Sequence, residues 1–141
     1  MELIYSKVEE GLLLHVITRL SDIEKQKSDR EDIVEADNFI QCSSLNMDYG
    51  KTFKPHKHIY KHRTYEKQIA QESWVVIKGA VRCIFYDIDN TIIAKPILMD
   101  GDASFTLAGG HTYEVLEDNT IVYEYKTGPY EGQENDKEFI D

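Results

Sequence analysis

Residues 72–86 read ESWVVIKGAVRCIFY, and this stretch decides the fold. The runs at 73–77 and 80–86 are short, apolar and rich in Val and Ile, which is typical of β-strands. Between them, Lys78 and Gly79 supply a turn. The pattern therefore predicts two neighbouring strands that form a hairpin.

Similar runs continue on both sides of this stretch. They lie at 11–20, 38–47, 91–99, 111–116 and 120–126. Turn-forming residues such as DGD (100–102) and EDN (117–119) separate the later ones. Pro96 cannot donate to a strand ladder, so it marks an edge or a bulge. Short strands at spacings of about 8–12 residues indicate an all-β sandwich or barrel. The charged segment 21–37 is predicted to be a loop or a short surface helix.

Composition limits the class of protein and its partners. The chain has 141 residues, 41% of them apolar, which suits one folded domain over residues 1–141. Its formal charge of -10, from 26 acidic and 16 basic residues, argues against binding the phosphate backbone of nucleic acid. No apolar run approaches the length of a membrane span, and the N-terminus does not resemble a signal peptide. We therefore expect a cytoplasmic protein with no nucleic-acid or membrane partner and a small-molecule ligand.

Residues 50–58, GKTFKPHKH, hold two of the five histidines, separated by one residue. On an extended strand His56 and His58 would point to the same face, and Pro55 favours extended backbone. Imidazole suits zinc, copper, iron and nickel, and two histidines with a carboxylate form a recurrent metal site. The alternative is a pair of surface histidines in a lysine-rich stretch.

Three stretches of the chain resemble, in order, the two motifs of the cupin superfamily. GKTFKPHKH resembles the opening of the first motif, a glycine, five residues and HxH, and ESWVVIKG (72–79) resembles its close, a glutamate, six residues and a glycine. GDASFTLAGGH (101–111) resembles the start of the second motif. The resemblance implies an all-β, single-domain cupin jelly-roll β-barrel, also called a double-stranded β-helix. Its motif region would lie at about residues 45–126.

The first motif departs from the family pattern in one respect. Thirteen residues separate His58 from Glu72, whereas cupins have three or four there. Glu66 and Gln71 therefore compete with Glu72 as the ligand that follows the histidine pair. Glu72 alone keeps the six-residue spacing to Gly79.

After residue 45 the chain is similar to small single-domain cupins that are often encoded near surface-polysaccharide or nucleotide-sugar genes. The resemblance implies one divalent transition metal per chain, zinc, iron, manganese or nickel. The implied ligands are His56, His58, Glu72 and His111. It also implies a homodimer, and it names no single reaction.

The leading interpretation is a metal-binding cupin that acts on a small polar or anionic metabolite, such as a sugar or nucleotide-sugar, with isomerase- or epimerase-like chemistry. His62 or Glu66 would then be the catalytic base. Arg63 and Arg82 could hold a carboxylate or phosphate, and Tyr113 could stack on a sugar ring. Two alternatives stay open: a non-catalytic binding protein that is accessory to polysaccharide biosynthesis, and an iron-dependent dioxygenase.

Strand alternation predicts which side chains share the interior with the implied ligands. If Glu72 faces inward, so do Trp74 and Val76, and if His111 faces inward, so do Tyr113 and Val115. His15 lies in an apolar strand-like run, so we expect it to be a hydrogen-bonded structural histidine.

Overall fold

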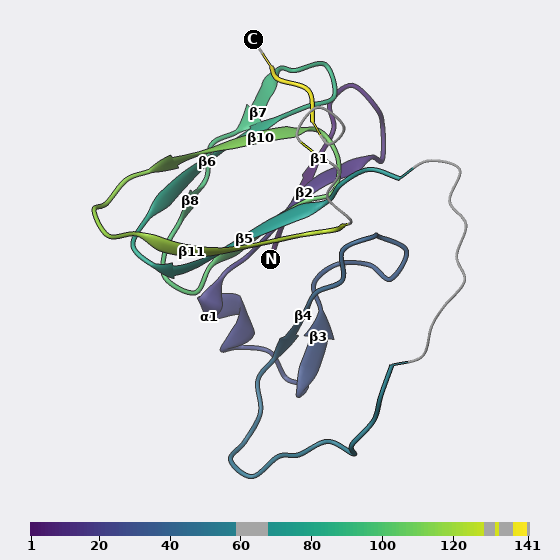
Figure 1. Ribbon diagram of the computed structural model, residues 1–141, viewed down its shortest axis with the longest axis vertical. Helices are drawn as coiled ribbons and strands as arrows, with labels where there is room; N and C mark the ends of the chain where they lie inside the picture. The colour runs from purple at the N-terminus through teal and green to yellow at the C-terminus, as the bar shows by residue number, and fades with distance from the viewer. Residues whose placement is uncertain (59–67, 129–131, 133–136, 141) are drawn as a thin grey trace.

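The computed structural model describes residues 1–58, 68–128, 132 and 137–140, and its regular structure is almost entirely β (Figure 1). The elements in chain order are β1 (Glu2–Tyr5), β2 (Leu13–Thr18), α1 (Leu20–Ile23), β3 (Arg30–Asp32), β4 (Ser43–Leu45), β5 (Glu72–Lys78), β6 (Val81–Tyr86), β7 (Ile92–Ala94), β8 (Ile97–Leu98), β9 (Ala103–Thr106), β10 (Gly110–Val115) and β11 (Ile121–Lys126). The all-β prediction is confirmed at this level.

Two antiparallel sheets face each other across the main core (Figure 1). The first has the strand order β1-β2-β9-β5-β11, and the second has the order β10-β6-β7 with β8 also paired to β6. Strands β3 and β4 form a separate hairpin. The pairings among the described residues leave the two sheets open, so they form a sandwich and not a closed barrel.

The predicted hairpin at 72–86 is wrong. Strand β5 pairs with β9 and β11, whereas β6 pairs with β10, β7 and β8 in the facing sheet. The chain changes sheets at Gly79, whose φ is +94° and whose N–H donates to Asp100 Oδ1 at 2.6 Å. A β-carbon at Gly79 would overlap the Thr120 side chain. Local alternation looks the same whether a chain folds back beside itself or crosses to a facing sheet, so the pattern could not distinguish the two.

The main core lies between the two sheets and draws on both. It consists of Ile4, Ile17, Val76, Val81, Cys83, Phe85 and Leu98. Trp74 and Tyr113 pack against it, so the predicted inward direction of Trp74, Val76 and Tyr113 is confirmed. Val115 pairs with the buried Val81 and so shares its face of the sheet, but at the end of the edge strand β10 it is 59% exposed and does not belong to the interior.

A second core covers the outer face of the five-stranded sheet. Ile33, Val34 and Ile40 pack there on side chains of β2 and β9. Gln71 fixes this layer, since its buried amide accepts from the Ile40 N–H at 2.9 Å and donates to the Leu107 carbonyl at 3.1 Å. The molecule thus has three layers, with the five-stranded sheet in the middle.

The other local predictions have mixed outcomes. Pro96 separates β7 from β8 as expected, and the run at 11–20 contains β2. The run at 38–47 supplies only the three-residue β4, and strand β1 was not predicted. In the segment 21–37, predicted to be a loop or a short helix, the short helix α1 is present at the start, but strand β3 was not predicted. In the part of the chain that the structure describes, no helix has both the length and the apolar character needed to cross a bilayer.

Candidate functional site

Glu72 and His111 meet at one end of the sandwich, and they come from opposite sheets. Glu72 begins β5, and His111 is the second residue of β10. His111 Nε2 lies 3.1 Å from Glu72 Oε1, and their side chains are 23% and 14% exposed. This places a titratable acid and a titratable base in contact at the boundary between core and solvent.

The strand register extends this polar end across the five-stranded sheet. His15 pairs with Thr106, Thr106 with Glu72, and Glu72 with Lys126, so the four side chains form one row on the inner face. The row lies beyond the last apolar layer of the core. The inner face therefore changes from apolar to polar at this end.

His15 is the buried member of the row. Its ring stacks on Phe85 with centroids 4.1 Å apart, and its Nδ1 lies 3.2 Å from Thr106 Oγ1. Burial lowers the pKa of His15 to about 4, and the charge of His111 acts in the same direction. The prediction of a hydrogen-bonded structural histidine is confirmed.

Glu72 is held in its ionised form by its surroundings. Burial by itself raises the pKa of the Glu72 carboxyl, but the hydrogen bond and charge of His111, with the charges of Lys126 and Lys137, outweigh it. The net pKa is below the ordinary value for glutamate. An ionised carboxylate at this place is ready to accept a cation or a hydrogen-bond donor.

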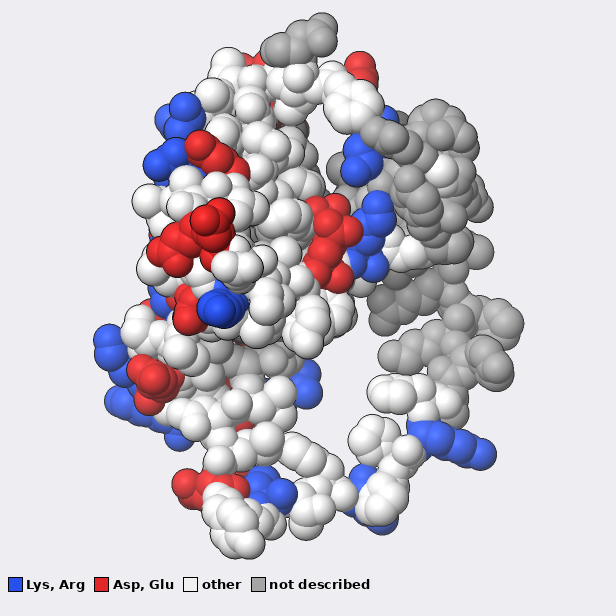
Figure 2. Space-filling model, turned by 60° about the vertical axis from the view of Figure 1, so that its left-hand side comes forward, with Lys and Arg blue, Asp and Glu red and all other residues white. Residues whose placement is uncertain are grey.

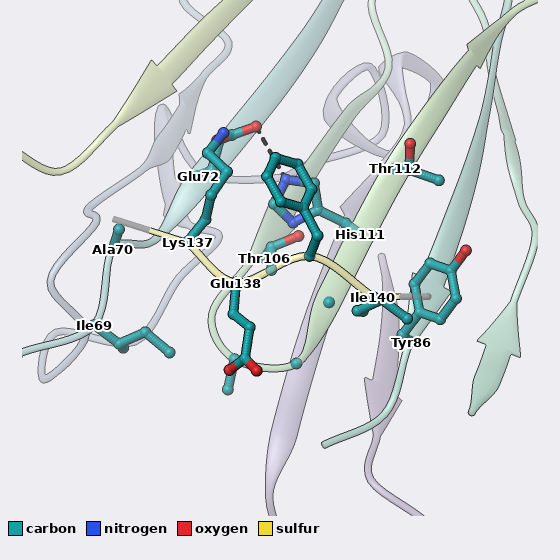
Figure 3. A pocket seen from close by; sticks show the side chains of 14 residues that line it. Ile69, Ala70, Glu72, Tyr86, Thr106, His111, Thr112, Lys137, Glu138 and Ile140 are labelled. Carbon is teal, nitrogen blue, oxygen red and sulfur yellow. Dashed lines mark hydrogen bonds and ion pairs between the residues drawn. The ribbon is translucent and has the colours of Figure 1, made fainter. Parts of the chain in front are cut away.

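A cavity of about 520 Å³ opens beside the pair (Figure 3). Side chains from both sheets line it, and the C-terminal residues 137–140 cross it. Its lining is Ile69, Ala70, Glu72, Tyr86, Thr106, Ala108, Gly109, Gly110, His111, Thr112, Lys137, Glu138, Phe139 and Ile140. This volume falls within the range of about 300–1,000 Å³ for small-molecule pockets.

His56 and His58 lie elsewhere. Residues 45–58 are all exposed, and the segment runs away from both sheets (Figure 1), with an open gap between it and the sandwich (Figure 2). The two rings are neighbours, with centroids 5.4 Å apart. Among the described residues, no group of three metal-ligating side chains lies close enough to hold an ion. The structure therefore brings together two of the four implied ligands, Glu72 and His111.

The three candidates for the ligand after the histidine pair separate clearly. Glu72 contacts His111, whereas the adjacent Gln71 points to the opposite face of the sheet and is 4% exposed in the second core. Glu66 falls outside the described residues, as do the predicted site residues His62 and Arg63. Of the residues that the structure describes, Glu72 is the one placed to act with His111.

Two other predicted site residues do not line the cavity. Tyr113 is packed inside the sandwich, stacked on Trp74 with ring centroids 3.9 Å apart, and its hydroxyl lies 3.2 Å from Ser104 Oγ. Arg82 faces outward on β6 and donates to Glu114 Oε2 at 2.5 Å across the strand pair. Tyr113 is thus a core residue, and Arg82 belongs to the outer surface.

Replacing Arg82 by glutamine is expected to change little. The Arg82–Glu114 pair is exposed, and exposed ion pairs contribute about 0–1 kcal/mol. We expect the free energy of unfolding to fall by no more than about 1 kcal/mol, as measured by urea denaturation. A larger loss, or a loss of ligand binding at the cavity, would contradict this placement.

Sequence reasoning missed two pocket residues, Thr106 and Lys137. Thr106 reaches the site through its register with Glu72, and Lys137 through the path of the C-terminus. Neither is marked by a local pattern, although Thr106 lies five residues before His111 in the second motif.

Comparison with models of protein families, with curated proteins and with solved structures gave no match to this chain. The chemistry of the chain is therefore inferred from its own geometry. The features that bear on it are the contact between Glu72 and His111, the polar row beside them and the cavity onto which they open.

Proposed function

We propose that this chain is a metal-binding cupin that holds a small polar or anionic metabolite, such as a sugar or nucleotide-sugar, in the cavity beside Glu72 and His111. The observation that carries the proposal is the contact between these two side chains, one from each sheet, at the opening of that cavity. Their two motifs lie far apart in the sequence, and both are needed to form the site.

The two donor atoms that the structure brings together are spaced as ligands of a divalent ion. Ligand distances of about 2.0–2.2 Å for histidine nitrogen and carboxylate oxygen put two neighbouring ligands roughly 3 Å apart, and His111 Nε2 and Glu72 Oε1 are 3.1 Å apart. We propose that His56 and His58 supply the remaining ligands, which requires the exposed segment 45–58 to move toward the sandwich when the ion binds. When bound, such an ion supplies Lewis acidity toward oxygen atoms of the metabolite.

The residues around the pair suit a polar ligand. Thr106 brings a hydroxyl to the cavity and Lys137 an ammonium group, so both hydrogen bonding and charge are available beside the ionised Glu72. For isomerase- or epimerase-like turnover, His62 or Glu66 would move the proton, with Arg63 as a further anion-binding group.

Metal analysis of protein purified without chelator tests this proposal. We expect about one divalent transition metal per chain. Loss of a group that only supports a ligand already costs metal affinity about 10–100-fold, so Glu72→Gln and the double variant His56→Ala, His58→Ala should each lower the affinity by about tenfold or more. Arg82→Gln, on the outer surface, is the matched control and should retain the metal.

The variants separate the two halves of the proposal. If Glu72→Gln loses the metal and the double histidine variant keeps it, the histidine pair is not part of the site. If the wild-type chain binds no divalent metal, or every variant keeps it, metal binding at Glu72 and His111 is contradicted.

A further inference from the structure

The C-terminal residues Lys137–Ile140 form one side of the cavity. All four line the 520 Å³ hollow, and Glu138, Phe139 and Ile140 also line a second hollow of about 350 Å³ together with Gly109 and Gly110. Figure 3 shows this segment crossing in front of His111. The segment therefore separates two neighbouring hollows at the end of the sandwich.

Ile140 is seated on Gly110, the residue directly before His111. A β-carbon at Gly110 would overlap Ile140 Cδ1, the flexible end of that side chain, so glycine lets Ile140 pack directly on the backbone. The other two nearest atoms to that position belong to Tyr86 and lie at 3.2 Å or farther. Lys137, Glu138 and Phe139 are exposed and Ile140 is half-buried, so Ile140 is the residue through which this segment packs on the sandwich.

Lys137 directs its charge into the cavity. Its side chain runs toward Glu72, whereas the Glu138 carboxylate points the other way (Figure 3). Within residues 1–58, 68–128, 132 and 137–140, no ion pair within 4.0 Å includes Lys137. Its charge acts on Glu72 from a distance, but no described carboxylate lies within ion-pair distance, so its N–H groups can donate to a ligand in the cavity.

We propose that Lys137 binds the anionic group, a carboxylate or a phosphate, of a metabolite in this cavity, and that the contact of Ile140 with Gly110 positions it. Lysine is a common phosphate-binding residue that acts as a point charge. On a chain with a formal charge of -10, an anion needs such a local positive group. The inference rests on the ligand pocket of the proposed function, but it requires no metal.

Inorganic phosphate is the probe, and metal-free protein is the sample. Thermal melting is followed as phosphate is added, with sodium chloride at matched ionic strength as the reference. We expect phosphate to raise the melting temperature of the wild-type protein. Because Lys137 supplies the positive charge of the site, Lys137→Met should weaken the apparent affinity by roughly tenfold. Lys78→Met, at the far end of β5, removes the same charge and should leave the affinity unchanged.

The positioning role has its own test, in which Lys137 stays intact. Ile140→Ala removes the side-chain carbons that rest on Gly110 and should weaken phosphate binding, although the variant alters no charged group. Gly110→Ala displaces the same methyl group. Because both substitutions remove one contact, the double variant should bind no more weakly than Ile140→Ala alone, whereas two independent structural effects would add.

Two results would overturn the anion site. One is that phosphate stabilises the wild-type protein no more than chloride does, and the other is that Lys137→Met binds phosphate with wild-type affinity. Ile140→Ala with wild-type affinity, or losses in the two single variants that add fully in the double variant, overturns the positioning contact. Metal content measured on the same proteins distinguishes this inference from the proposed metal site. A chain that binds metal but shows no Lys137-dependent phosphate binding refutes only this inference. A chain that shows Lys137-dependent phosphate binding but binds no metal refutes only the metal site.

Discussion

The Asp102→Ala variant is expected to have a free energy of unfolding about 3 kcal/mol below that of the wild-type protein. The Asp102 carboxylate is buried and accepts three hydrogen bonds, from Arg19 Nη1 at 2.7 Å, the Met99 N–H at 3.0 Å and the Leu20 N–H at 3.2 Å. Hydrogen bonds to a charged group contribute about 1.5–3 kcal/mol each, and donors left unpaired add a penalty. Because Arg19 is partly exposed, water recovers some of this loss.

Two asparagine substitutions provide the controls, measured by urea denaturation of metal-free protein. In Asp102→Asn the amide keeps one acceptor oxygen and places an NH2 group against donors, so most of the loss should remain. Asp100 is exposed and accepts one bond, from the Gly79 N–H, which an amide oxygen can replace. Asp100→Asn should therefore cost less than about 1 kcal/mol. An Asp102→Ala protein within about 1 kcal/mol of wild type would contradict this role.

The role of Asp102 could not be predicted from the motif that contains it. In GDASFTLAGGH the sequence placed a turn before a strand, which is where β9 begins. In the structure the Asp102 carboxylate connects the start of α1 to the turn before β9, because it accepts hydrogen bonds from Arg19 and Leu20, about 80 residues earlier in the chain. No local pattern contains that information, since Arg19 and Leu20 lie at the junction of β2 and α1 and no sequence motif marks them.

The inward direction of side chains was predictable, because alternation along a strand is a local property. Trp74, Val76 and Tyr113 pack against the main core as the pattern predicted. The choice of partner strand was not predictable. The turn at Gly79 carries β6 into the facing sheet, and the pairing of β5 with β9 and β11 depends on segments far along the chain.

The residues of the candidate site also fall into those that the sequence predicted and those that it did not. Motif order selected Glu72 and His111, and the fold places them in contact. Thr106 and Lys137 reach the cavity through strand register and the path of the C-terminus, which the sequence does not display. Arg82 was a candidate because of its charge, but the register sets it against Glu114 on the outer face. Charge alone therefore does not indicate which face of a strand a residue occupies.

Acidification is expected to destabilise the protein between pH 6.5 and 4.5, with His15 as the main cause. Burial lowers the pKa of His15 from the ordinary 6.5 to about 4, helped by the charge of His111 and opposed by the Tyr86 carbonyl and the charge of Asp87. In this range the unfolded chain binds a proton at His15 and the folded chain does not, so stability falls as pH falls. At one pKa unit per 1.36 kcal/mol, the loss is roughly 2–3 kcal/mol by pH 4.5.

The sign distinguishes this effect from that of the carboxylates. Four carboxyl groups have folded-state pKa values below their ordinary ones: Asp22, Asp32, Glu72 and Asp87. Their contribution to stability is fully present above the ordinary pKa and is lost as the pH falls through the lowered pKa of the folded state. Between pH 6.5 and 5.5 they stay ionised in both the folded and the unfolded chain, and closer to pH 4.5 the unfolded chain begins to bind protons at Glu72, whose ordinary pKa is 4.5. The slope of stability against pH between pH 6.5 and 5.5 therefore reports on His15.

Urea denaturation of metal-free protein at pH 7.5, 6.5, 5.5 and 4.5 measures this slope. His15→Gln keeps a hydrogen-bonding side chain beside Thr106 but cannot titrate, so its stability at pH 7.5 should be lower and its slope below pH 6.5 nearly flat. His58→Gln, in the exposed segment away from the sandwich, should keep the wild-type slope. If His15→Gln loses stability with acid as steeply as wild type, burial of neutral His15 is not the cause of acid destabilisation.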